Sequence, residues 1–180
     1  EAHGIPYETV PGVTSAIAVP ECAGIPVTHR GVSRSFHVIT GHTRDGEDCL
    51  PPEFETYGSL PGTLVFLMGL GQLPAIAARL IEGGMAPDTP AAVIEKGTLP
   101  DQRTVRAPLS GIYAKVMEAG IGTPAIIVVG ETASFDMKCD LKCRSFGPLS
   151  GYRIGMVGTR HFTDSLGHAL KQEGAVVSPI

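Results

Sequence analysis

Apolar residues in this chain gather in blocks that have the length of β-strands. Gly62–Gly69 and Pro124–Gly130 are nearly continuous apolar runs, and Pro90–Ile94 is a third. Runs of this kind are typical of strands that are buried on both faces of a sheet. Ser35–Gly41 instead alternates between apolar and polar residues and predicts a strand that ends at Gly41. The more polar Arg103–Pro108 predicts a strand at the sheet edge.

The segments between these blocks follow a helical period. Apolar residues recur every three or four positions over residues 73–81, and Gly83-Gly84 predicts the end of that helix. The same spacing predicts a helix over residues 109–119, while shorter helices are expected over 16–22 and near 52–57. Strands that alternate with helices predict an α/β domain, with a mixed or mostly parallel sheet flanked by helices.

The first bend of the chain is a candidate binding site. Tyr7–Val10 is a β-branched and aromatic run that predicts a strand, and Pro11-Gly12 then predicts a turn. Thr14 and Ser15 follow at the expected start of the first helix, where short hydroxyl side chains are favoured. Backbone N–H groups at such a helix start suit an anionic or polar small ligand. An ordinary strand-to-helix turn would have the same sequence.

The last third of the chain predicts a second unit. Residues 131–150 show no long periodic run and contain charge, Gly and Pro, and we interpret 136–150 as a linker. A strand over 153–159, a helix over 164–173 and a strand over 175–178 would then form one βαβ unit, within residues 151–180. Because the chain opens inside an apparent helix tail and stops after an apparent strand, we expect it to be a piece of a longer polypeptide.

Composition excludes several classes of function. The net charge of −4 argues against general electrostatic binding of nucleic acid. No apolar run reaches the roughly 20 residues of a membrane span, and no secretion signal precedes the first strand. We therefore expect a cytoplasmic protein that has no membrane partner.

The cysteines do not predict a metal site. Cys139 and Cys143 have C-x3-C spacing, but no second pair and no nearby His accompany them, and Cys22 and Cys49 lie far away in the sequence. We interpret all four as reduced structural or surface thiols.

Five motifs, in order and at their spacing, carry a specific resemblance to a known family. They are VPGVTSAIAVPECAGIPVTHRG (10–31), SFHVITGH (35–42), GTLVFLMGL (62–70), VIEKGTLPDQRTV (93–105) and GTPAIIVVGE (122–131). With them, residues 1–135 resemble the C-terminal half of the uroporphyrinogen-III C-methyltransferases, which are tetrapyrrole methylases. The tail from Gly151 looks like the opening of uroporphyrinogen-III synthase, so a fused methyltransferase–synthase polypeptide is expected.

The resemblance implies a cofactor and the residues that bind it. The family uses S-adenosyl-L-methionine, releases S-adenosyl-L-homocysteine, holds the cofactor between two α/β domains and usually forms homodimers. By its pattern Thr14, Ser15, Met68 and Gly97 would bind the cofactor, and Gly69 would let backbone approach closely. From the residues alone, a core position is the favoured interpretation of Met68, and Gly97 could equally be an ordinary turn glycine.

The resemblance also implies a polycarboxylate substrate, uroporphyrinogen III, which arginine and histidine side chains would bind. Arg30 is the best candidate, together with His29 and His42, followed by Arg34 and Arg44, although all could be solvated loop residues. His42 is also our hypothesis for a catalytic base, because an imidazole can take up a proton near neutral pH.

Other functions stay open at this point. Another precorrin methylase, a diphthamide-pathway enzyme or a ribosomal RNA methylase would share the superfamily, and the chain could also be a non-catalytic dimerisation module. The family's N-terminal Gly-rich turn and Gly-Asp-Pro loop do not occur here, so we expect little catalysis from this chain alone. His161 and His168, in the synthase-like tail, are expected at the surface.

Overall fold

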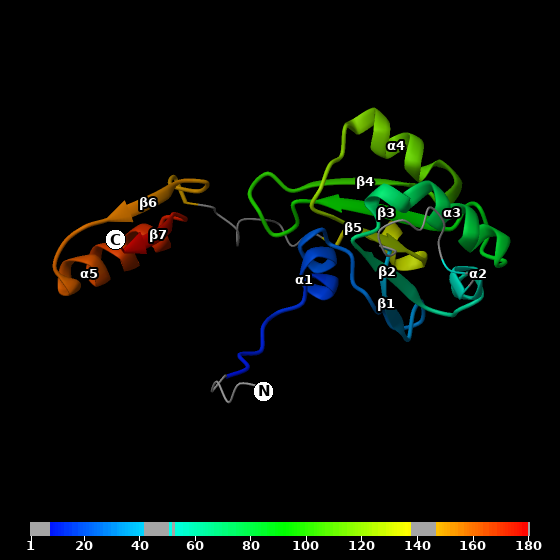
Figure 1. Ribbon diagram of the computed structural model, residues 1–180, viewed down its shortest axis with the longest axis horizontal. Helices are drawn as coiled ribbons and strands as arrows, with labels where there is room; N and C mark the ends of the chain where they lie inside the picture. Colours follow the sequence, from blue (N-terminus) through cyan, green and yellow to red (C-terminus); the bar gives the residue numbers. More distant parts are fainter. Residues whose placement is uncertain (1–7, 42–50, 52, 138–146, 180) are drawn as a thin grey trace, which may run out of the picture.

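The computed structural model describes residues 8–41, 51, 53–137 and 147–179. Residues 8–137 contain a five-stranded sheet in the order β1-β2-β5-β3-β4 (Figure 1). The strands are β1 (Phe36–Thr40), β2 (Thr63–Leu67), β3 (Pro90–Glu95), β4 (Arg103–Pro108) and β5 (Ala125–Val129). Each corresponds to a predicted strand, and β4 lies at the edge as expected.

The direction of the strands decides between the two predicted sheet types. β1 and β2 are parallel, whereas β5 pairs antiparallel with both β2 and β3, and β3 pairs antiparallel with β4. The mixed sheet is therefore confirmed, and the mostly parallel alternative is wrong. The reason is that β3 and β4 form a hairpin, and β5 inserts between β2 and β3 in the opposite direction.

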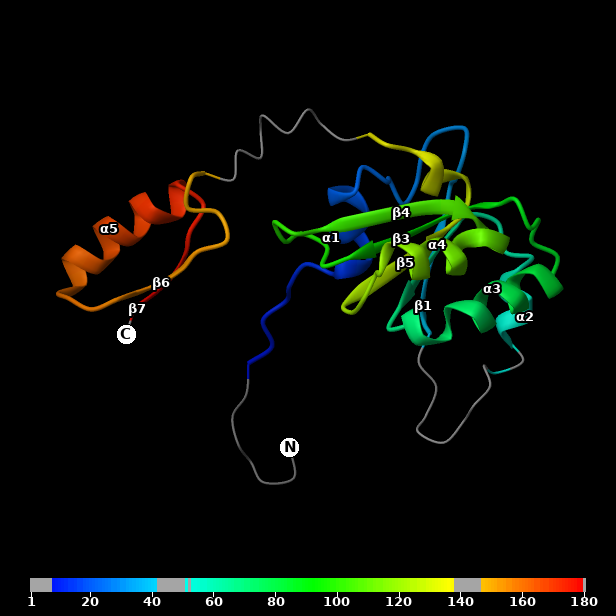
Figure 2. The same cartoon turned by 90° about the horizontal axis from the view of Figure 1, so that it is seen from above.

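Helices cover both faces of the sheet (Figures 1 and 2). The α-helices are α1 (Ser15–Cys22), α2 (Glu53–Tyr57), α3 (Leu73–Glu82) and α4 (Ile112–Ala119), and short 3₁₀ turns are η1 (Leu70–Gln72), η2 (Leu109–Gly111) and η3 (Glu131–Ser134). The predicted 109–119 helix thus begins as a 3₁₀ turn.

Successive side chains of β2 belong to two separate hydrophobic cores, one on each face of the sheet. Leu64 and Phe66 pack with α3 and α4 on one face, whereas Val65 packs with α1 and η3 on the other. All three side chains are fully buried. Because successive strand residues point to opposite faces, a continuous apolar run is required in such a strand.

The strand expected over Tyr7–Val10 is wrong for its described residues. Residues 8–14 have no regular secondary structure, and Val10 and Val13 are 80% and 87% exposed. A strand needs a neighbour to satisfy its backbone groups, and none of the described strands pairs with this segment. Tyr7 itself lies outside the described residues.

The second unit is the predicted βαβ arrangement. β6 (Arg153–Met156) and β7 (Val176–Pro179) are parallel and are connected by α5 (Arg160–Gln172). The helix begins four residues before the predicted position, directly after Thr159. His161 and His168 are exposed, as predicted.

Within the described ranges, no helix is both long and apolar enough to cross a membrane. His42, Arg44, Cys49, Cys139 and Cys143, which the sequence analysis discussed, lie outside those ranges.

Candidate functional site

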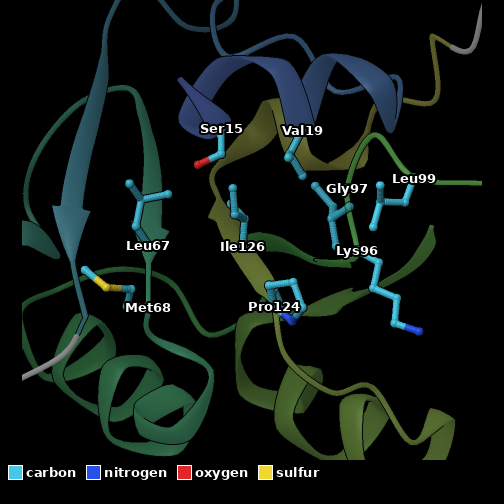
Figure 3. Close-up of a pocket in the computed structure, with 11 residues that line it drawn as sticks. Ser15, Val19, Leu67, Met68, Lys96, Gly97, Leu99, Pro124 and Ile126 are labelled. Atoms are coloured by element: carbon cyan, nitrogen blue, oxygen red, sulfur yellow. The ribbon is translucent and has the colours of Figure 1, made fainter. Parts of the chain in front are cut away.

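An apolar pocket of about 460 Å³ opens beside the start of α1, at the edge of the sheet where β2 and β3 end (Figure 3). Four segments that are far apart in the sequence form its walls. These are α1, the end of β2, the loop after β3, and the start of β5; the lining residues are Ser15, Val19, Leu67, Met68, Ile94, Lys96, Gly97, Leu99, Pro124, Ala125 and Ile126. We refer to this as the main pocket.

Three of the four predicted cofactor-binding residues line the main pocket. Ser15, Met68 and Gly97 come from three different walls, as Figure 3 shows. Thr14 does not line the pocket; its Oγ1 accepts a hydrogen bond from the Ala16 N–H at 3.2 Å and caps α1. The structure brings the predicted residues together, while their roles toward a cofactor stay predictions.

Met68 is not a core residue. Its side chain is 66% exposed, and its backbone has a φ of 55°. Lys96 and Thr98, in the loop after β3, have φ values of 49° and 71°. These three are the non-glycine residues with positive φ in the described part of the chain, and strained backbone of this kind gathers at binding sites. The residue types at these three positions do not indicate a positive φ.

Gly97 is required for packing between this loop and α1. A Cβ at position 97 would lie 2.7 Å from the Val19 Cβ and still closer to its two methyl groups. Similarly, a Cβ at Gly69 would lie 2.9 Å from the Ile76 Cδ1. In both cases the close approach that the glycine allows is to the protein's own side chains.

Gln102 ties the loop after β3 to α1, a contact that the sequence analysis missed. Its Oε1 accepts a hydrogen bond from the Thr98 N–H at 2.8 Å, and its Nε2 donates to the Cys22 carbonyl at 3.3 Å. The Lys96 N–H also donates to the Pro124 carbonyl at 2.9 Å. Two walls of the main pocket are therefore fixed to their neighbours by hydrogen bonds.

Lys96 is the single charged residue in the described lining of the main pocket, and Figure 3 shows its amine pointing away from Ser15 and Met68. The Lys96 Nζ lies 2.7 Å from the Asp101 Oδ2, and this hydrogen bond and the charge of Asp101 raise the pKa of Lys96. The same contact lowers the pKa of Asp101.

An ion pair between the buried Glu95 and the half-exposed Arg103 holds the base of the same loop. Glu95 is 5% exposed and accepts hydrogen bonds from the Gly122 N–H at 3.0 Å and from the Arg103 Nε at 2.6 Å. Burial by itself would raise the pKa of Glu95, but these hydrogen bonds and the Arg103 charge bring it below its ordinary value of 4.5. Arg103 also donates to the Ala119 and Gly120 carbonyls and so joins the loop to the end of α4.

Of the predicted substrate-binding residues, Arg30 and His29 do not line the main pocket, and His42 lies outside the described residues. Thr28, His29, Arg30, Gly31, Ser33 and Arg34 line a separate depression of about 340 Å³. Ser33 donates or accepts a hydrogen bond with Thr63 at 3.0 Å, which places this depression at the amino end of β2, opposite Met68.

Among the described residues, this depression offers cationic side chains to a ligand. Arg30 and Arg34 are exposed and form no ion pair with any residue of the described ranges. The His29 ring packs edge-on against Phe135 at 4.9 Å, and its Nδ1 is buried without a hydrogen-bond partner among the described residues. This arrangement suits carboxylates.

Taken together, the mixed sheet, its two helical layers and an apolar pocket at the strand ends define an α/β protein with a pocket of the size that small-molecule sites have. The family model for tetrapyrrole (corrin/porphyrin) methylases matches residues 1–113. The chain therefore belongs to the tetrapyrrole methylase family.

Relatives agree with this assignment. The chain is 40% identical over 173 residues to a Bacillus subtilis uroporphyrinogen-III C-methyltransferase, covering 96% of this chain and 35% of the relative. It is 41% identical over 173 residues to the porphyrin biosynthesis protein HemD of Ruminiclostridium josui, covering 96% and 34%. The chain thus spans about a third of the length of these two relatives.

A solved structure has the same fold. The uroporphyrin-III C-methyl transferase of Thermus thermophilus, in complex with S-adenyl homocysteine, matches with a TM-score of 0.58 and 34% identity. The match covers 73% of this chain and 55% of that one.

Proposed function

We propose that this chain contributes the C-terminal half of an S-adenosyl-L-methionine-dependent uroporphyrinogen-III C-methyltransferase that makes precorrin-2 for sirohaem and cobalamin synthesis. The observation that carries the proposal is the convergence of Ser15, Met68 and Gly97 on one apolar pocket. The named relatives and the family match support the same reaction class.

The main pocket fits the nucleoside part of the cofactor. Its volume of about 460 Å³ lies within the range of about 300–1,000 Å³ that small-ligand pockets have. Leu67, Leu99 and Pro124 offer apolar surface to a purine ring, and the Ser15 hydroxyl and the start of α1 offer polar contacts. Thr14, Ser15, Met68 and the backbone at Gly97 are the proposed cofactor contacts.

Methyl transfer makes few demands on side chains. The cofactor supplies a methyl group on a sulfonium, which reacts by in-line displacement. The protein must orient the two reactants and exclude water, and the apolar walls of the main pocket suit that task. A base must take the proton that leaves the methylated carbon; His42 is our hypothesis for it.

Arg30, His29 and His42 are the proposed substrate contacts. The depression that holds Arg30 and His29 is at the opposite end of β2 from the main pocket. The resemblance to the family implies a homodimer, which forms part of the proposal.

The tail adds a second domain to the proposal. We infer that residues 1–135 form the methylase subdomain, 136–150 the linker and 151–180 the start of a uroporphyrinogen-III synthase-like domain. The βαβ order of β6, α5 and β7 supports this, as does the 173-residue match to a relative named HemD. The two activities would catalyse consecutive steps of one pathway.

Isothermal titration calorimetry of the full-length protein with S-adenosyl-L-homocysteine tests the proposal. We expect one site per chain, and we expect Leu99→Glu to weaken binding at least tenfold, because it places a carboxylate in an apolar wall. Leu166→Glu, on α5, is the matched control and should bind normally. Absence of binding by the unmodified protein would favour the non-catalytic dimerisation module.

A further inference from the structure

The tight turn that carries Arg30 is held by its backbone and by one buried side chain. His29 and Ser33 exchange two backbone hydrogen bonds of 2.9 Å each, and Gly31, with a φ of 80°, lies between them. Of residues 28–34, all of which the structure describes, Ser33 alone is buried. Arg30 itself is exposed and forms no ion pair with a described residue. The position of its side chain therefore depends on how the backbone of this turn is held.

Ser33 begins a chain of buried hydroxyl groups. Its Oγ lies 3.0 Å from the Thr63 Oγ1, which in turn lies 2.9 Å from the Thr132 Oγ1. Both threonines are fully buried, Thr63 at the start of β2 and Thr132 in η3. We call Ser33, Thr63 and Thr132 the hydroxyl chain. It joins three segments that are far apart in the sequence.

The directions of these hydrogen bonds follow from the chemistry of a hydroxyl group, which has a single hydrogen to donate. The Ser33 Oγ donates to the Ser35 carbonyl at 2.9 Å, so it accepts from Thr63. Thr63 has then used its hydrogen and accepts from Thr132. Each hydroxyl of the chain donates to a defined acceptor. A buried network that is satisfied in this way favours one arrangement of the segments that it joins.

The same 3₁₀ turn holds the other arm of the Arg30 turn. Phe135 directly follows η3, and its ring packs edge-on against the His29 ring at 4.9 Å. The two ends of the turn, His29 and Ser33, are thus both fixed from η3. None of the hydroxyl-chain residues belongs to the described lining of the main pocket, which lies at the opposite end of β2.

On the basis of the proposed function, we propose that Ser33, Thr63 and Thr132 are positioning residues for substrate binding. They hold the turn from His29 to Ser33 so that Arg30 meets a carboxylate of uroporphyrinogen III. Because they are buried, they act through Arg30 and do not contact the reactants. The hydroxyl chain then affects the KM for the tetrapyrrole, and neither the methyl-transfer step nor the affinity for the cofactor.

Two substitutions of Thr63 separate hydrogen bonding from packing. Thr63→Val keeps the shape of the side chain and removes the central hydroxyl, whereas Thr63→Ser keeps the hydroxyl and removes a methyl group. Thr104→Val is the matched control, because Thr104 is half-buried in β4, at the other edge of the sheet from β1, and lines neither the main pocket nor the depression. Thr132→Val removes only the last donor of the chain and takes the place of Thr63→Val if that variant does not fold.

The full-length protein is measured with and without reactants. Hydrogen–deuterium exchange of the His29 and Ser33 amides, without any ligand, reports how firmly the turn is held. The KM for uroporphyrinogen III and kcat come from transfer of labelled methyl groups, and the Kd for S-adenosyl-L-homocysteine comes from calorimetry. Loss of the two hydrogen bonds of Thr63 should speed exchange and raise the KM about tenfold each, with kcat and Kd within about twofold. Thr63→Ser and Thr104→Val should behave like the unmodified protein.

Several results would overturn the proposal. Unchanged exchange in Thr63→Val would show that the hydroxyl chain does not hold the turn, whatever the activity. Faster exchange with an unchanged KM would show that the turn does not serve the substrate. An equal rise of KM in Thr63→Ser would assign the effect to packing, and an equal rise of Kd would assign it to the sheet as a whole. Failure of the unmodified protein to bind S-adenosyl-L-homocysteine would instead refute the proposed function, and the exchange measurement would still decide whether the hydroxyl chain holds the turn.

Discussion

Substituting Gly97 tests whether packing against α1, and not only access for a ligand, requires glycine at this position. In Gly97→Ala the new methyl group would overlap the methyl groups of Val19, which is 6% exposed. The φ of Gly97 is not in the left-handed region, so alanine adds no backbone strain. Overpacking of this kind costs about 1–3 kcal/mol of unfolding free energy.

A second substitution on α1 turns this into a quantitative test. Val19→Ala alone removes two buried methyl groups at about 0.8 kcal/mol each and leaves a small cavity, so we expect a loss of roughly 2 kcal/mol. In the double variant, the methyl group added at position 97 enters the space that the Val19 methyl groups have left. The double variant should therefore be more stable than the sum of the single effects predicts, by about 1–2 kcal/mol.

Urea unfolding at pH 7, followed by far-UV circular dichroism, measures these free energies. Gly111→Ala is the control, because its added methyl group would contact nothing within 4 Å. Single effects that add to within about 0.3 kcal/mol would refute the packing argument. So would a Gly97→Ala variant of normal stability that fails to bind S-adenosyl-L-homocysteine, since the glycine would then serve the ligand alone.

Three further predictions concern the elements around the main pocket. Thr14→Ala removes the N-cap of α1 and should cost about 1 kcal/mol of unfolding free energy in urea, whereas Thr14→Ser should not. Gln102→Glu replaces the donor to the Cys22 carbonyl with a carboxylate oxygen, so calorimetry should show a several-fold higher Kd for S-adenosyl-L-homocysteine. Because the hydrogen bonds from the Gly122 N–H and Arg103 outweigh the effect of burial and lower the pKa of Glu95, Glu95 stabilises the fold at neutral pH and loses that effect as the pH falls below about 4.5. Urea unfolding of Glu95→Gln should therefore vary less with pH in this acidic range.

Each of these has an outcome that contradicts it. Equal stability of Thr14→Ala and Thr14→Ser would show that the hydroxyl does not cap α1. An unchanged Kd for Gln102→Glu would show that the hydrogen bond from Gln102 to the Cys22 carbonyl does not affect the main pocket. A Glu95→Gln variant that loses stability at low pH as steeply as the unmodified protein would assign the acid sensitivity to other carboxylates.

The elements of the fold could be predicted from the sequence because each carries its own local pattern. The buried run that became β2 and the helical spacing over residues 73–81 needed no information from elsewhere in the chain. The expected strand at Tyr7–Val10 failed since strand formation depends on a neighbouring strand, which a local pattern does not reveal. The antiparallel insertion of β5 is likewise a property of the assembled sheet.

The site was predictable only in part, for a related reason. Ser15, Met68 and Gly97 were singled out by family motifs, and the structure places all three on the main pocket. The positive φ of Lys96 and the bridging amide of Gln102 are imposed by contacts across the fold, and neither residue type indicates them. The separation of Arg30 from the main pocket also required the three-dimensional arrangement.

The mixed sheet still places its pocket where a parallel sheet would. β5 is antiparallel to both β2 and β3, so those two strands run in the same direction, and β1 is parallel to β2. The carboxyl ends of β1, β2 and β3 therefore lie along one edge of the sheet. Loops that leave such an edge form a crevice for ligands in α/β proteins. The pocket follows from the shared direction of these three strands, and reversing β5 between them brings Pro124 and Ala125 to the same edge as a fourth wall.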